Sequence, residues 1–166
     1  MVNESVTQQG TVVAAFSGTG KTFVAARYPN VLELDVGTFR FIDDAPADIP
    51  FEARKAMKSY EINPKWPKNY IDALRSGLKS YQMVLTVHTP ELDDFGVEYA
   101  RFVPKESAWD ILEQRFRDRG NPERFIQIQK LRFQDEKQLA EYESNYIIDD
   151  NEYLEDALVR CGFLKG

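Results

Sequence analysis

The chain has 166 residues, of which 43% are hydrophobic and 13% aromatic, and this composition excludes an intrinsically disordered protein. Its net charge of −6 disfavours a nucleic-acid-binding surface, and its single cysteine, Cys161, excludes an internal disulfide. The first ten residues are polar, and no run approaches the ~18 consecutive apolar residues of a membrane span. The sequence therefore predicts one cytoplasmic domain over residues 1–166, with neither membrane nor nucleic acid as a partner.

The stretch from Thr11 to Tyr28, TVVAAFSGTGKTFVAARY, holds the most specific pattern in the chain. It predicts a buried strand to Phe16, a glycine-rich turn over residues 17–20 and a helix that opens at Lys21. A strand, a glycine loop and a helix in this order are the context of a phosphate-binding loop. Glycines let successive backbone N–H groups point into one concavity, which holds an anion. The alternative interpretation is an ordinary glycine turn.

The residue types in this loop suit the phosphates of a nucleoside triphosphate. Lys21 would reach the β- and γ-phosphates, and the Thr22 hydroxyl would ligate Mg²⁺. Ala15 replaces the glycine that usually opens the motif, and Phe23 stands where a dinucleotide-binding pattern needs its third glycine. The predicted nucleotide contacts are Ser17, Gly18, Thr19, Gly20, Lys21 and Thr22.

A second strand is predicted at residues 31–35, so strand, helix and strand form a βαβ unit, which indicates a parallel sheet. Asp35 falls at the carboxyl end of that strand, where ligands bind in open α/β sheets. Its carboxylate is interpreted either as a group that holds Mg²⁺ or an acceptor molecule, or as the start of a turn.

Residues 36–66 form the least regular part of the chain, with a helix predicted at 51–60, and are interpreted as an acceptor-binding arm. In that arm Phe39, Phe41 and Trp66 could stack on a planar group while Arg40 clamps an anion. The alternative is that these aromatic residues form a small core of the arm itself.

The remaining chain alternates predicted helices and strands, as expected of a parallel five-stranded sheet with helices on both faces. Strands are predicted at residues 82–87, 97–103 and 145–148, and helices from residue 67 and at 91–95, 106–119, 122–144 and 152–160. The candidate inner residues in and after the long helix are Ile128, Leu131, Leu139, Tyr142 and Tyr146. His88, the only histidine, follows the third strand, where a structural role is favoured over a catalytic one.

Two arginine-bearing helices flank a glycine turn at Gly120. Arg115 and Arg119 are four residues apart and share a helical face, whereas Arg117 points elsewhere. One interpretation is a solvated hairpin whose charges are balanced by neighbouring acids. The other is a lid over residues 113–126, whose guanidinium groups close over phosphates. Arg124 opens the second helix of this pair.

Together these motifs resemble the small P-loop kinases, namely the nucleoside monophosphate kinases and their shikimate- and gluconate-kinase relatives. The resemblance rests on AAFSGTGKT at residues 14–22, on QRFRDRGNPER at 114–124, which is similar to the lid of adenylate kinases, and on the long helix followed by YIIDDNEYLEDAL at 146–158. It implies a three-layer P-loop fold that binds ATP and Mg²⁺ and transfers the γ-phosphoryl group to a small acceptor. The leading acceptor is a (deoxy)nucleoside monophosphate. Kinase-like proteins of this pattern are common in bacteriophages, so a phage or bacterial source is expected.

The resemblance assigns the catalytic roles to Lys21, Asp35, Arg115, Arg119 and Arg124, with Arg132 as a further phosphate contact. The chain also departs from the family pattern: Phe125-Ile126 stand where paired aspartates often follow the lid, and no arginine follows the third strand near His88. Two other hypotheses remain open. One is an ATPase coupled to a macromolecular partner, and the other is a nucleotide-binding protein without catalysis.

Overall fold

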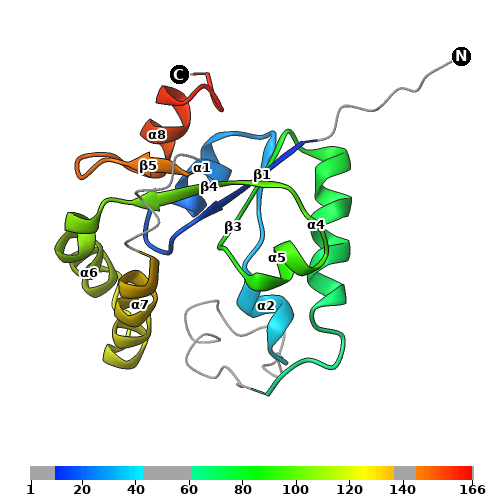
Figure 1. Ribbon diagram of the computed structural model, residues 1–166, viewed down its shortest axis with the longest axis horizontal. Helices are drawn as coiled ribbons and strands as arrows, with labels where there is room; N and C mark the ends of the chain where they lie inside the picture. Colours follow the sequence, from blue (N-terminus) through cyan, green and yellow to red (C-terminus); the bar gives the residue numbers. More distant parts are fainter. Residues whose placement is uncertain (1–9, 43–60, 137–144, 166) are drawn as a thin grey trace, which may run out of the picture.

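The computed structural model describes residues 10–42, 61–136 and 145–165 (Figure 1). Its centre is a sheet of five strands, all parallel, in the order β2-β3-β1-β4-β5. The strands are β1 (Thr11–Ala15), β2 (Val31–Glu33), β3 (Met83–Thr86), β4 (Tyr99–Pro104) and β5 (Tyr146–Ile148). The predicted α/β class and the five parallel strands are therefore confirmed.

Helices cover both faces of this sheet (Figure 1). Helices α1 (Lys21–Arg27) and α8 (Leu154–Arg160) pack on one face, and α4 (Lys68–Ser80) and α5 (Pro90–Asp94) on the other. The remaining described helices are α2 (Val36–Arg40), η1 (Glu106–Ala108), α6 (Trp109–Asp118) and α7 (Glu123–Glu136). None of the helices in the described ranges is long and apolar enough to cross a membrane.

The alternation of β1 explains why two separate cores form. Successive side chains of a strand point to opposite faces, so Val13 and Ala15 join the core under α8, whereas Val12 and Ala14 join the core under α4. All four residues are at most 2% exposed. A strand buried on both faces reads as a continuous apolar run, which is the pattern found in the sequence.

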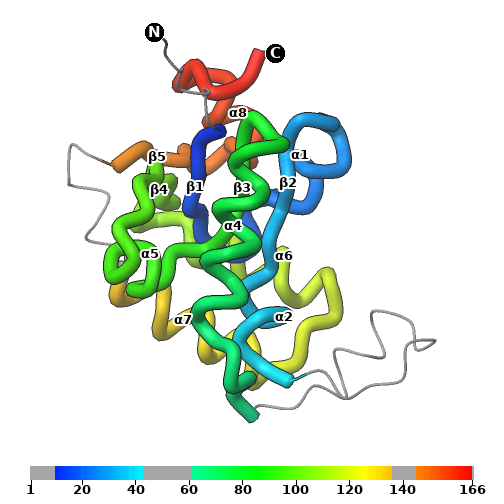
Figure 2. The backbone as a smooth tube through the Cα atoms, turned by 90° about the vertical axis from the view of Figure 1, so that its right-hand side faces the viewer, coloured from blue at the N-terminus to red at the C-terminus, as the bar shows by residue number. Residues whose placement is uncertain are grey.

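A third apolar cluster joins α6 and α7 to the end of β1. Phe16 packs there with Leu112 and Phe116 of α6 and with Ile126 and Phe133 of α7. The two helices lie side by side at the edge where β1 and β4 end, as both backbone views show (Figures 1 and 2). This cluster fixes the helical pair against the segment that follows β1.

The helix α2 was not predicted, because its sequence VGTFR contains glycine and β-branched residues, which are weak helix formers. The Asp35 carboxylate caps it by accepting hydrogen bonds from the backbone N–H of Gly37 (3.1 Å) and the hydroxyl of Thr38 (3.3 Å). Strand β2 consequently ends at Glu33, two residues earlier than predicted.

The prediction of the inner face of α7 was wrong. Ile128 and Leu131 are 39% and 63% exposed, whereas Ile126, Gln129 and Phe133 are buried. The latter three recur at i, i+3 and i+7, and their face is selected by contact with Phe16 and α6, which is non-local information. Tyr146 is likewise 37% exposed. The predicted inner residues Leu139 and Tyr142 and the predicted helix at 51–60 lie outside the described residues.

Candidate functional site

In the turn between β1 and α1, two glycines adopt left-handed backbone conformations. Gly18 and Gly20 have φ angles of 79° and 108°, in the left-handed region that other residues avoid. At Gly18 a side chain is also sterically excluded, because a Cβ atom there would lie 2.8 Å from Cε1 of Phe116. The two glycines therefore allow the loop to curve, and Gly18 allows it to pack against α6.

Lys21 turns its side chain back into this curve. Its side chain is buried, and Nζ donates hydrogen bonds to the carbonyl oxygens of Ala15 (3.1 Å) and Phe16 (3.0 Å). The buried Thr19 hydroxyl donates to the same Phe16 oxygen at 2.7 Å. The ammonium group thus lies within the turn, where an anion in the loop would meet it.

Two later segments hold the loop from outside. The backbone N–H of Leu154, at the start of α8, donates to the Thr19 oxygen at 2.7 Å. Arg115 of α6 donates from Nη1 to the Gly18 oxygen at 2.9 Å, and its guanidinium lies 4.0 Å above the ring of Tyr153. Arg115 is therefore clamped between the loop and the C-terminal helix.

The other arginines assigned to a lid are placed differently. The side chains of Arg119, at the end of α6, and Arg124, in the first turn of α7, are exposed to solvent. Arg117 pairs with Glu113 at 2.8 Å and with Glu123 at 2.9 Å, and its hydrogen bonds lower the pKa of both carboxyls. At Arg117 the structure fits a solvated, ion-paired hairpin.

The Thr22 hydroxyl donates to Oε1 of Glu33, at the end of β2, at 2.8 Å. Sequence reasoning selected Asp35 and missed Glu33, although an acid inside the run VLELD was a visible signal. The Glu33 carboxylate thus contacts the first turn of α1, whereas the Asp35 carboxylate caps α2. No larger group of metal-ligating side chains gathers among the residues that the structure describes.

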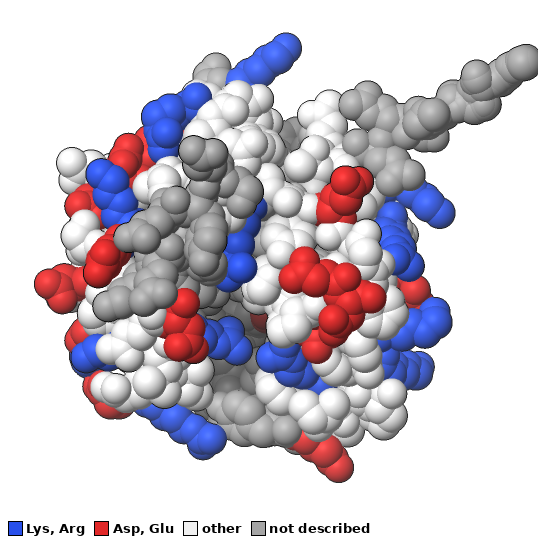
Figure 3. Space-filling model, viewed as in Figure 1, with Lys and Arg blue, Asp and Glu red and all other residues white. Residues whose placement is uncertain are grey.

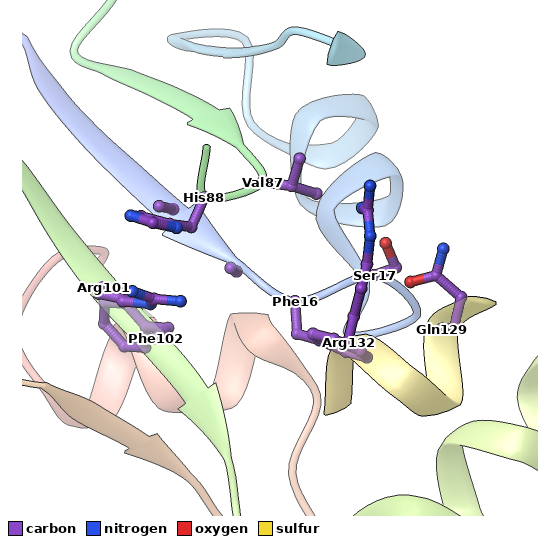
Figure 4. Close-up of a pocket in the computed structure, with 10 residues that line it drawn as sticks. Phe16, Ser17, Val87, His88, Arg101, Phe102, Gln129 and Arg132 are labelled. Carbon is purple, nitrogen blue, oxygen red and sulfur yellow. The ribbon is translucent and has the colours of Figure 1, made fainter. Parts of the chain in front are cut away.

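Beside the loop is a small cleft that is open to solvent. Its walls come from the end of β1, the segment after β3, strand β4 and helix α7, and they include Ser17, His88, Arg101, Gln129 and Arg132 (Figure 4). Sequence reasoning missed Arg101 because its position depends on strand pairing: it lies opposite Ala14 in the sheet. An arginine is thus present near His88, although none follows β3 in the sequence.

His88 is packed into one wall of the cleft. Its ring lies 5.5 Å from that of Tyr99, and Nε2 lies 3.7 Å from a carboxylate oxygen of Asp93. Burial lowers the pKa of His88 below its ordinary value, and the nearby Arg101 charge lowers it further, against the opposing effect of Asp93. A neutral imidazole at pH 7 follows from these contacts.

Two of the three aromatic residues predicted to stack on an acceptor, Phe39 and Trp66, contact Tyr70. The rings of Phe39 and Trp66 lie 5.8 and 5.5 Å from that of the fully buried Tyr70. The Tyr70 hydroxyl is 2.6 Å from that of Thr86, and Arg40 lies over Trp66 at 4.8 Å. These contacts match the small-core interpretation for Phe39 and Trp66.

A scan against protein-family models and a search of curated proteins found no match to this chain. The fold and the site by themselves define an α/β protein with a five-stranded parallel sheet, at one edge of which a glycine loop, a buried lysine and several arginines come together.

Proposed function

We propose that the chain binds ATP with Mg²⁺ at residues 17–22 and transfers the γ-phosphoryl group to a small acceptor, with a (deoxy)nucleoside monophosphate as the leading acceptor. The observation that carries the proposal is the buried Lys21 ammonium inside a glycine turn at the carboxyl end of the central strand. In open α/β sheets ligands bind at that edge. The resemblance of AAFSGTGKT to the small P-loop kinases supports the same function.

The transfer requires in-line positioning and charge neutralisation rather than covalent catalysis. An acceptor oxygen forms the new bond to the γ-phosphorus, while the bond to the β–γ bridging oxygen breaks and its electron pair leaves with ADP. Lys21 would exchange its two carbonyl contacts for phosphate oxygens, and Arg115 adds a second positive charge against the loop. The exposed Arg119 would have to move inward to take part.

The first turn of α1 also fits Mg²⁺. This ion is usually held by one or two carboxylates together with substrate phosphates, and Thr22, Glu33 and Asp35 supply a hydroxyl and two carboxylates. When bound, Mg²⁺ would neutralise charge on the β- and γ-phosphates.

A partner-coupled ATPase is the less favoured candidate. Such enzymes usually carry an acidic group at the end of the strand next to the loop, and here Thr86 stands there with its hydroxyl against that of Tyr70. The cleft beside the loop, with Arg101 and Arg132 in its walls, suits a small charged acceptor instead.

The first experiment measures the melting temperature with and without ATP–Mg²⁺. We expect a rise in the wild-type protein and the loss of most of it in Lys21→Ala, because this change removes the cation inside the loop. Lys79→Ala, at the exposed end of α4, is the matched control and should keep the rise. A normal rise in Lys21→Ala would show that the loop is not the nucleotide site.

The second experiment separates a kinase from an ATPase. ATP consumption is measured alone and with a panel of nucleoside monophosphates and small hydroxy acids. A kinase should turn over slowly with ATP alone and orders of magnitude faster with one member of the panel. Acceleration only by a macromolecular partner would favour the coupled ATPase.

A further inference from the structure

The cleft beside the loop contains a buried polar atom that lacks a partner. Gln129 is 5% exposed, and among the described residues its Oε1 has no hydrogen-bond partner. Its neighbours on the buried face of α7 are Ile126 and Phe133, both apolar. A leucine would therefore satisfy the packing at this position. A buried acceptor without a donor destabilises the folded state, and such a residue needs an explanation beyond packing.

The amide lies where the loop and the cleft meet. Figure 4 shows the oxygen end of Gln129 on the side of Ser17, which belongs both to the glycine loop and to the cleft wall. Phe16, whose carbonyl oxygen accepts from Lys21, lines the same cleft. A molecule in the cleft would therefore lie directly beside the phosphates of a nucleotide held by the loop.

Positive charge faces this space from two sides. Arg101 of β4 stands with His88 on one wall, and Arg132 of α7 stands with Gln129 on the other (Figure 4). Figure 3 shows Lys and Arg side chains on both sides of the hollow in this face of the molecule. Negative charge is also near, because Asp93 contacts His88 and Glu91 acts on both His88 and Arg40. These carboxylates belong to α5, whereas Gln129 and Arg132 belong to α7, and the charges of Glu91 and Arg132 both act on Arg40.

Resting on the proposed function, we propose that this cleft holds the acceptor, that Arg101 and Arg132 bind its anionic group, a phosphate or a carboxylate, and that Gln129 accepts a hydrogen bond from a neutral hydroxyl or amino group of the same molecule. Gln129 is then the residue that selects among anionic acceptors. A site built to hydrogen-bond a substrate group discriminates strongly against analogues that lack it, because its own polar atom is left unpaired.

The test uses Gln129→Leu, with Gln127→Leu as the matched control on the same helix. Gln127 is exposed and donates to Glu123 outside the cleft. Initial rates are measured with ATP–Mg²⁺ against the four deoxynucleoside monophosphates and gluconate. Gln129→Leu should raise KM for the accepted compound at least 10-fold, while the melting temperature of the free protein stays equal or rises because the unpaired oxygen is gone. Gln127→Leu should change neither quantity.

The anion contact is tested with Arg132→Gln against Lys130→Gln, which removes the same charge from the exposed face of α7 near Glu113. We expect a KM increase of 10-fold or more only for Arg132→Gln, and Arg101→Gln should behave in the same way. Which of the monophosphates or gluconate responds identifies the anion as a phosphate or a carboxylate.

The outcomes distinguish a failure of this inference from a failure of the proposed function. A bridging water would satisfy Gln129 without any ligand, and then Gln129→Leu would leave every KM unchanged, which overturns this inference but not the kinase activity. If ATP–Mg²⁺ raises the melting temperature but no compound of the panel is phosphorylated, the inference is also overturned and nucleotide binding stands. If ATP–Mg²⁺ does not bind, both proposals fall.

Discussion

Gly18 and Gly120 have the same backbone conformation in different surroundings. Their φ angles are 79° and 78°. A Cβ atom at Gly18 would lie 2.8 Å from the buried ring of Phe116, whereas no described heavy atom lies within 4 Å of one at Gly120. Alanine at either position would incur the free-energy cost of a left-handed backbone. Only alanine at position 18 would also incur the cost of overpacking, so comparing the two substitutions separates the two costs.

We predict that Gly120→Ala lowers the free energy of unfolding by about 1–2 kcal/mol through backbone strain alone. Gly18→Ala should lower it by a further ~1–3 kcal/mol, because the Phe116 ring has to shift. It should also remove the ATP-induced rise in melting temperature. Urea unfolding at 25 °C measures both energies, and equal losses would mean that α6 does not brace the loop.

A second prediction at this scale concerns the pH dependence of stability. The pKa of His88 is lower in the folded protein than in the unfolded chain, so below about pH 6.5 the unfolded chain binds a proton more readily. The contribution of His88 to stability therefore falls as the pH is lowered from 7 towards 5. His88→Gln should lose less stability over that range than the wild type, as measured by urea unfolding at both pH values.

The acidic residues whose pKa values are lowered, Glu113, Glu123 and Glu152, also reduce stability as the pH falls. They are the same in both proteins, so the difference between the two pH profiles isolates His88. Identical profiles would mean that the imidazole is solvated rather than packed against Tyr99.

At the scale of elements, two arginines at the end of α6 differ in their contacts: Arg115 holds the glycine loop, whereas Arg119 is exposed to solvent. We predict that Arg115→Ala lowers the free energy of unfolding by about 1–2 kcal/mol, because its hydrogen bond to Gly18 and its contact with Tyr153 are lost. Arg119→Ala should change stability by less than about 0.5 kcal/mol, since Arg119 is an exposed residue.

If Arg119 moves onto the transferring group during turnover, its substitution by alanine should lower kcat by a factor on the order of 10³. The measurement is steady-state turnover with the accepted acceptor, together with the melting temperature of the free variant. A near-normal kcat for Arg119→Ala would remove it from the lid and leave the phosphate loop untouched.

The sequence predicted the elements whose signals are local. The loop could be recognised because its glycines, Lys21 and Thr22 are adjacent, and the strands because residues buried on both faces form apolar runs. The helix α2 was missed because its residues, VGTFR, are mostly weak helix formers. The orientation of α7, and with it Gln129, depends on contact with Phe16, and the position of Arg101 depends on pairing with β1. These are long-range contacts that no local pattern carries.

At the scale of the whole molecule, the sheet separates two cores that share no side chain. Ile71 belongs to the core under α4, and Ile148 to the core under α8. Each Ile→Val substitution should lower the free energy of unfolding by about 0.5–1.5 kcal/mol. We predict that the two losses add within ~0.3–0.5 kcal/mol in the double variant, because the sites share no contact.

Urea unfolding of the two single variants and the double variant completes this cycle. A coupling energy well above that range would show that the sheet transmits strain from one core to the other, and that the two faces do not behave as separate units.

The central place of β1 has a consequence for the ribosome-bound chain. Val13 pairs with Leu85 on one side and with Ala100 on the other, and at about 5–20 residues per second the earlier of these two, Leu85, is synthesised roughly 4–14 s after Val13. During that time an apolar strand waits without either neighbour, exposed to misfolding and to chaperones. The glycine loop lacks one of its contacts for longer, because the Thr19 oxygen is bonded by the backbone N–H of Leu154, which is synthesised later still. A nascent chain that stalls before Leu154 therefore contains the glycine motif but lacks the hydrogen bond from Leu154 to the loop.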